Sequence, residues 1–231
     1  MNKPINAITK KDLYQIVESI RSKNGVDYSE IGEDFHNYCS NFKGFDVLYH
    51  KFKTRAVRGL AIVDEKIIFL NPLRTDTEQN FDCAHEFFHV VLHKNSGHRT
   101  FNCCDYAHPK QDPYLEWQAN EAGAELLIPY KKFIPEFVSA IQCCDDFCDY
   151  WNIVDSFATE YRVTHTVIRN RIDSLRYEIY QHEIKDTPVN KLIITSASKQ
   201  KENGIYIPSY HDRFGTNKKA PVLVAQNKGE Y

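Results

Sequence analysis

A helix predicted over about residues 78–94 constrains this chain more than any other segment. Apolar side chains cover most of its circumference, at Cys83, Ala84, Phe87, Phe88, Val90, Val91 and Leu92. A helix that is apolar on nearly every face must be buried. The His and Glu side chains that share this helix therefore need partners, because an unpaired polar group in the interior is costly.

Those polar residues form the pattern His85-Glu86-x-x-His89. On a helix, His85 and His89 lie one turn apart on one face, so both imidazoles can bind one metal ion while Glu86 projects beside it. This arrangement is typical of a zinc peptidase. The alternative is a buried helix whose histidines are satisfied core residues, and it explains two histidines and a glutamate in one motif less well.

A catalytic zinc ion normally has three protein ligands and one position open for water, so a third ligand is needed. His93 continues the four-residue series after His89. Each such step turns the side chain by about 40°, so His93 lies roughly 80° round the helix from His85. We therefore predict that His93 lies beside the metal ligands and is not one of them.

Glu116 is the better candidate for the third ligand and lies on a second helix, predicted over residues 113–127. Zinc peptidases of the thermolysin type take a Glu from a second helix and follow it four residues later with an Asp or Asn that orients a ligating His. Here that residue is Asn120. Glu121 and Glu125 on the same helix are the competing candidates.

The remaining segments predict an α+β fold. Residues 45–52, 59–63 and 66–70 are rich in aliphatic and aromatic side chains and predict a small, mostly antiparallel sheet before the motif helix. Residues 94–112 are polar and predict a flap or the rim of a cleft. We divide the chain into a metallopeptidase domain (1–150), a helical module (151–180) and a C-terminal extension with short strands (181–231), the strands being residues 192–195, 204–207 and 222–225.

Residues 153–177 predict a helix, a tight turn and a second helix, similar to a helix-turn-helix. One interpretation is DNA binding through Arg169, Arg171 and Arg176 on the second helix. The other is a packing module, which we favour because acidic residues lie close by and the chain's net charge is only −2.

Composition narrows the remaining choices. The N-terminus has no apolar run that could be a signal peptide, and no stretch approaches eighteen apolar residues, so we expect a cytoplasmic protein outside the membrane. The seven cysteines are then expected to be reduced. The pairs at 103–104 and 143–144 lack the C-x-x-C spacing of a structural zinc site, so we interpret them as small buried side chains.

In these features the chain resembles the ImmA/IrrE family of metallopeptidases. The resemblance covers about residues 8–178. It rests on the two-stranded segment before the motif, on the helix-turn-helix-like segment, and on three stretches of sequence. These are His85-Glu86-x-x-His89 with His93, Glu116-x-x-Ala119-Asn120, and Ala124 to Pro129. The chain departs from the family pattern at two positions. Phe88 stands where the family commonly has Gly, and Ala122 where it often has Phe.

The resemblance implies a thermolysin-type (gluzincin-like) zinc peptidase core. It implies that His85, His89 and Glu116 bind Zn²⁺, that Glu86 is the catalytic base, and that the substrate is a helix-turn-helix repressor, as for an antirepressor or stress-response regulator. The oxyanion donor stays open among Tyr114, His93, His98 and His108. The competing hypothesis is a DNA-binding or partner-binding regulator whose metal site is structural or sensory.

Overall fold

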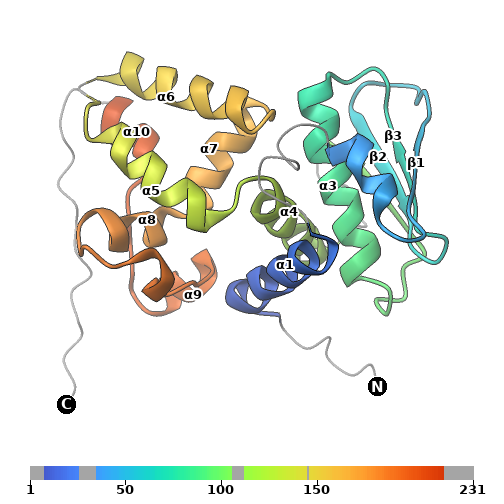
Figure 1. Cartoon of the computed structure of the whole chain (residues 1–231), viewed down its shortest axis with the longest axis horizontal. Coiled ribbons are helices and arrows are strands. Elements are labelled where there is room, and N and C mark those ends of the chain that lie inside the picture. Colours follow the sequence, from blue (N-terminus) through green and yellow to red (C-terminus); the bar gives the residue numbers. More distant parts are fainter. Residues whose placement is uncertain (1–7, 26–34, 106–111, 145, 216–231) are drawn as a thin grey trace.

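The computed structural model describes residues 8–25, 35–105, 112–144 and 146–215. These residues form a mixed α+β fold, as predicted, with the sheet at one side and most of the later helices at the other (Figure 1). The strands are β1 (Asp46–Tyr49), β2 (Val57–Ile62), β3 (Ile67–Leu70) and β4 (Thr100–Cys104). The helices are α1 (Lys10–Asn24), α3 (Asp76–Leu92), α4 (Pro113–Leu127), α5 (Tyr130–Ile141), α6 (Phe147–Glu160), α7 (His165–Ser174), α8 (Arg176–Glu183), α9 (Ala197–Glu202) and α10 (Tyr210–Gly215), with 3-10 turns at Cys39–Asn41 and Val189–Lys191. Among them, none is long and apolar enough to cross a membrane.

The sheet has four strands in the order β1-β3-β2-β4. Strands β1 and β3 are parallel, whereas β2 pairs with both β3 and β4 in the antiparallel sense. The prediction of a small, mostly antiparallel sheet is therefore confirmed. Strand β4 was not predicted, because it lies in the segment 94–112 that its polar composition assigned to a loop. Only Phe101 and Cys103 of its first four residues are buried, which is too short an alternation to stand out in the sequence.

Helix α3 lies between the sheet and helix α4 and carries the motif (Figure 1). It begins with a capping box, in which the Thr75 hydroxyl accepts from the Glu78 amide and the Glu78 carboxylate accepts from the Thr75 amide. Most of its apolar side chains are buried, as expected for a helix that is apolar on most faces, whereas Phe81, Val91 and Leu92 are partly buried. Phe88 and Ala122, the two departures from the family pattern, are both fully buried in the hydrophobic core.

Helices α3 and α4 approach each other closely at Gly123. A Cβ atom added there would lie 3.3 Å from the Ala84 carbonyl carbon and 3.3 Å from the His85 amide nitrogen. These distances are shorter than ordinary van der Waals contacts, so a side chain at Gly123 would force the two backbones apart. The glycine therefore sets the separation between the helix that carries the histidines and the helix that carries Glu116.

Helices α6 and α7 follow one another with a tight turn between them, as predicted, and Thr164 caps α7 by accepting from the Val167 amide. Arg162 in this turn has a φ of 50°, in the left-handed region. Arg171 is buried, with only 1% of its surface exposed, so the expectation that it could contact DNA is wrong for this structure. The helix-turn-helix description, the thermolysin-type description and the domain limits at 150 and 180 stay predictions.

The C-terminal extension contains none of the expected strands within the residues that the structure describes. Residues 192–195 and 204–207 have no sheet partner there, and 222–225 lie outside the described ranges. The prediction of strands at the first two sites is therefore wrong. Side chains of α8 take the place of a neighbouring strand, because Gln181 bonds both the amide and the carbonyl of Ile193, and Glu178 accepts from the Thr195 amide.

A buried ionic cluster centred on Arg171 joins α7 to α1 and α4. Its guanidinium donates to the Tyr14 hydroxyl at 2.7 Å, to the Glu121 carboxylate at 3.0 Å and to the Ile128 carbonyl at 3.0 Å. It also bonds the Glu125 carboxylate. Burial raises the pKa of Glu125 to about 7, and the charge of Arg171 opposes this rise.

Lys10 extends the cluster to helix α8. Its ammonium group donates to the Glu178 carboxylate at 3.1 Å and to the Ser174 carbonyl at 2.6 Å, and it lies 3.9 Å from Glu121. Burial alone raises the pKa of Glu121, but Lys10 and Arg171 together outweigh it and lower this pKa. The cluster thus binds α1, α4, α7 and α8 into one unit, and each of its charges depends on the others.

We expect the Arg171→Met variant to lose about 3–5 kcal/mol of unfolding free energy, because it removes the main counter-charge of buried Glu125 and one of the two counter-charges of buried Glu121. Urea denaturation measures the change. The matched control is Lys132→Met, which breaks an exposed ion pair with Glu160 at 2.7 Å and is expected to cost about 1 kcal/mol or less. Similar losses in the two variants would contradict the role assigned to the cluster.

Candidate metal centre

The structure brings His85 and His89 of helix α3 together through their Nε2 atoms, which lie 3.0 Å apart. Both side chains are almost completely buried. Burial lowers the pKa of each imidazole, and that of His89 falls to about 4. Both rings are therefore neutral near pH 7, which is the form that binds a metal ion.

Glu116 of helix α4 faces the same point. Its carboxylate oxygens lie 3.4 Å from the Nε2 atoms of His85 and His89. Burial raises the pKa of Glu116, but the neighbouring imidazoles of His85 and His89, which can take up protons as the pH falls, outweigh this effect and hold the pKa well below its usual range. Helix α4 begins only three residues earlier, with Asp112 as its cap and Pro113 in its first turn, so Glu116 projects from a fixed helix start.

Asn120 lies behind His85. Its Oδ1 atom is 2.9 Å from His85 Nδ1, so the ring donates its Nδ1 proton to the amide oxygen and leaves the Nε2 lone pair facing the site. This is the place that the spacing from Glu116 predicts for an orienting residue. One turn of α4 thus supplies both a candidate ligand and the group that fixes the tautomer of another.

His93 lies behind His89 in the same way. The Nδ1 atoms of the two rings are 2.9 Å apart, and His93 Nε2 lies 2.9 Å from the Gln118 side-chain oxygen. The chain of bonds is complete if His93 donates to Gln118 and accepts from His89, which leaves the His89 Nε2 lone pair facing the site. In this structure His93 therefore contacts a candidate ligand from behind, the position expected from its angle round the helix, and Gln118 is a member of the site that the sequence did not indicate.

The competing ligand candidates, Glu121 and Glu125, lie elsewhere. Both carboxylates bond Arg171 in the buried ionic cluster and are absent from the group of metal-binding side chains found among the described residues. Of the three acidic residues on α4 that could complete the site, the structure brings only Glu116 to the histidines.

Glu86 is fully buried next to the two histidines. Strand β2 leaves room for it at Gly59, where an added Cβ would lie 2.9 Å from Glu86 Oε1. Burial raises the pKa of Glu86 to about 8, and Cys103 and Arg58 oppose the rise. Because this pKa lies close to neutrality, Glu86 can both take up and release a proton there, as a group that acts in turn as base and acid must.

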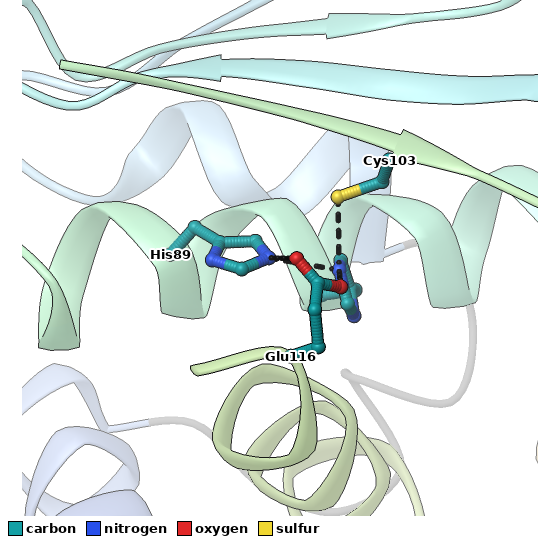
Figure 2. Close-up of side chains that lie close together, drawn as sticks. His89, Cys103 and Glu116 are labelled. Carbon is teal, nitrogen blue, oxygen red and sulfur yellow. Dashed lines mark hydrogen bonds and ion pairs between the residues drawn. The ribbon is translucent and has the colours of Figure 1, made fainter. Parts of the chain in front are cut away.

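Cys103 of strand β4 is a fourth donor that the sequence analysis missed. Its sulfur lies 3.0 Å from His85 Nε2, and one donor atom from each of His85, His89, Cys103 and Glu116 lies within 4.8 Å of every other. Figure 2 shows His89, Cys103 and Glu116 pointing toward one another from α3, β4 and α4. The earlier interpretation of this cysteine as a small buried side chain with no further role is incomplete, and recognising β4 as a strand would have placed Cys103 and Phe101 on one face.

The four side chains fit a zinc ion. Zinc prefers nitrogen, sulfur and carboxylate oxygen donors in a tetrahedral arrangement, and bonds of about 2.0–2.3 Å place neighbouring donors roughly 3.3–3.6 Å apart. The separations of 3.0 and 3.4 Å found here are close to that range. Two histidines and a glutamate from neighbouring helices, with a further glutamate in the His-Glu-x-x-His motif, define the class of site used by zinc peptidases.

The chain belongs to the peptidase M78 family. The family model, described as the IrrE N-terminal-like domain, matches residues 42–173, more than half of the chain, and confirms the family expected from the sequence. Among curated proteins there is no match. A solved structure, a Mycobacterium tuberculosis transcriptional regulator, superposes with a TM-score of 0.51 at 13% identity over 72% of this chain and 47% of that one. The chain thus matches less than half of that regulator's length, and the likeness shows the fold alone.

We expect the Glu116→Gln variant to lose metal affinity, because an amide replaces an anionic donor facing both histidines. The loss should exceed the roughly 10- to 100-fold weakening expected for Asn120→Ala, which removes only an orienting partner. Competition against a chromogenic chelator during zinc titration measures both. Glu86→Gln is the matched control and should keep its affinity; a weakening in it equal to that of Glu116→Gln would show that Glu86 is itself a ligand.

Proposed function

We propose that this protein is a zinc-dependent endopeptidase. The observation that carries the proposal is a buried group of metal-binding side chains, formed by His85, His89 and Glu116, with buried Glu86 of the same helix close enough to Glu116 for its charge to help raise the pKa of Glu86. Membership of a peptidase family supports it. In the proposed assignment the two histidines and Glu116 hold the metal, and Asn120 and His93 orient the histidines.

Zinc, when bound, polarises the scissile carbonyl and lowers the pKa of water to about 7. The protein supplies the remaining chemistry. Glu86 accepts a proton from the attacking water and delivers it to the leaving amine. Its burial raises its pKa, so Glu86 can hold the proton between these two steps. Neutral His85 and His89 stay in their ligand form because Asn120 and the His93–Gln118 pair accept their Nδ1 protons.

Two of the four candidate oxyanion donors have other partners. The Tyr114 hydroxyl donates to the Ile8 carbonyl at 3.0 Å, and His93 is held between His89 and Gln118. His108 lies outside the described residues. His98 is the candidate that remains among the described residues, and its ring lies 5.6 Å from that of Phe101, which stacks on His89.

For the substrate we propose a helix-turn-helix repressor. The resemblance noted in the sequence supports this class, and the likeness in fold to a transcriptional regulator is consistent with a regulatory role. A cleft of about 510 Å³ between α3, α4 and α7, lined in part by Arg58, Trp117 and Asn120, reaches the residue that bonds His85 from behind and offers both charged and apolar contacts. The candidate ligands themselves do not line it. A regulator acting by DNA binding is less well supported, because Arg171 is inside the fold.

The Glu86→Gln variant should keep its zinc and lose cleavage by about 10²- to 10⁴-fold, because glutamine cannot accept the proton. The assay is incubation of the zinc-loaded protein with purified helix-turn-helix repressors from the same organism, followed by mass spectrometry of the fragments. Glu160→Gln, an exposed substitution of the same kind, is the control and should cleave normally. Cleavage by Glu86→Gln at the wild-type rate would reject Glu86 as the base, and absence of cleavage by the wild type would favour a regulator with a structural or sensory metal.

A further inference from the structure

Strand β4 covers both histidines of the metal centre. Phe101 stacks on the His89 ring with 4.1 Å between centroids and 17° between planes, and two residues later Cys103 points its sulfur at His85. Both side chains are buried, and both are on the same face of the strand. The strand is therefore positioned to supply a donor from the side opposite to Glu116 (Figure 2).

The sheet is irregular beside Cys103. Strands β2 and β4 change register between Val57 and Gly59, so that Gly59 pairs with Cys103 while Val57 pairs with Cys104. The additional residue, Arg58, is in β2, and such a bulge bends the strand that contains it. Gly59, the partner of Cys103, also makes room for Glu86, so the cysteine and the proposed base lie at the same residue of β2.

We propose that Cys103 is a fourth ligand of the metal and that it holds the peptidase in a latent state. Three protein ligands leave one position of a tetrahedral zinc ion open, whereas four leave none. Binding releases the thiol proton to solvent, and departure of the sulfur from the metal takes up a proton again and opens that position to water. The ligation follows from the donor geometry, whereas the latency rests on the proposed peptidase function.

Substitution with cobalt(II) tests the ligation without any assay of cleavage. A thiolate bound to cobalt gives an intense sulfur-to-metal charge-transfer band in the near ultraviolet. The wild-type protein should show this band, and the Cys103→Ala variant should lose it while still binding one cobalt ion. Cys104→Ala is the matched control, because Cys104 is the next residue of β4 and is absent from the donor group, and it should keep the band.

A wild-type cobalt protein without the band, or a Cys103→Ala protein that retains it, would overturn the ligation. Cys103→Ser is a second variant of nearly the same size. Its oxygen cannot give the sulfur band, so it decides the question if the alanine variant does not fold.

Cleavage of the repressor then tests the latency. If about one tenth of the wild-type protein is open at rest, Cys103→Ala should cleave about tenfold faster, and Cys104→Ala should match the wild type. An unchanged or slower rate for Cys103→Ala would overturn the latency. Failure of every variant to cleave would reject the peptidase itself, and the cobalt band would still decide whether Cys103 is a ligand.

Discussion

The close approach of helices α3 and α4 at Gly123 is the constraint on which the site depends. With the two backbones this near, residues 116, 118 and 120 of α4 all reach histidines of α3. Glu116 faces the donor atoms, whereas Gln118 and Asn120 bond the histidines from behind. A wider spacing would separate the acidic ligand and both orienting amides from the histidines at once.

This arrangement also explains how a nearly all-apolar helix accommodates three histidines and a glutamate. His85 bonds Asn120 through its Nδ1 atom, and His89 bonds His93 through its own. His93 in turn bonds Gln118, so these hydrogen bonds all lie on the side away from the metal site. The cost of burying these polar groups is thus met by side chains of α4. Glu86 is the exception, and its raised pKa is the direct result of burial.

Much of the site follows from local sequence, because helical spacing fixes where residues four apart must point. That rule placed His85 and His89 together, moved His93 behind them and put Asn120 one turn after Glu116. The spacing to Asn120 favoured Glu116 as the third ligand, but Glu121 and Glu125 stayed as competitors, since all three lie on one helix and only tertiary contacts separate them. In the structure, Glu121 and Glu125 bond Arg171 in the buried ionic cluster, which leaves Glu116 to face the histidines.

Features that depend on long-range partners were beyond the reach of the sequence. Strand β4 has too few apolar residues to be recognised alone, and its structure comes from pairing with β2. Residues 192–195 have the composition of a strand, yet side chains of α8 bond their backbone in its place. Composition alone therefore predicts neither segment. The polar segment forms a strand because β2 pairs with it, and residues 192–195 form none because side chains of α8 bond their backbone.

Access to the metal centre raises a final physical question. His85 and His89 are almost fully buried, and Glu116, with 21% of its side chain exposed, is the most open of the candidate ligands. A peptide must therefore displace part of the protein to reach them.

Helices α3 and α4 are held by the contact at Gly123, and α4 is anchored again by the cluster around Arg171. Among the strands that the structure describes, β4 is at the edge of the sheet and pairs only with β2, through an irregular register, so fewer strand pairings hold it than hold β2 or β3. Its movement would withdraw Phe101 and Cys103 together, which uncovers His89 and frees the fourth position in one step.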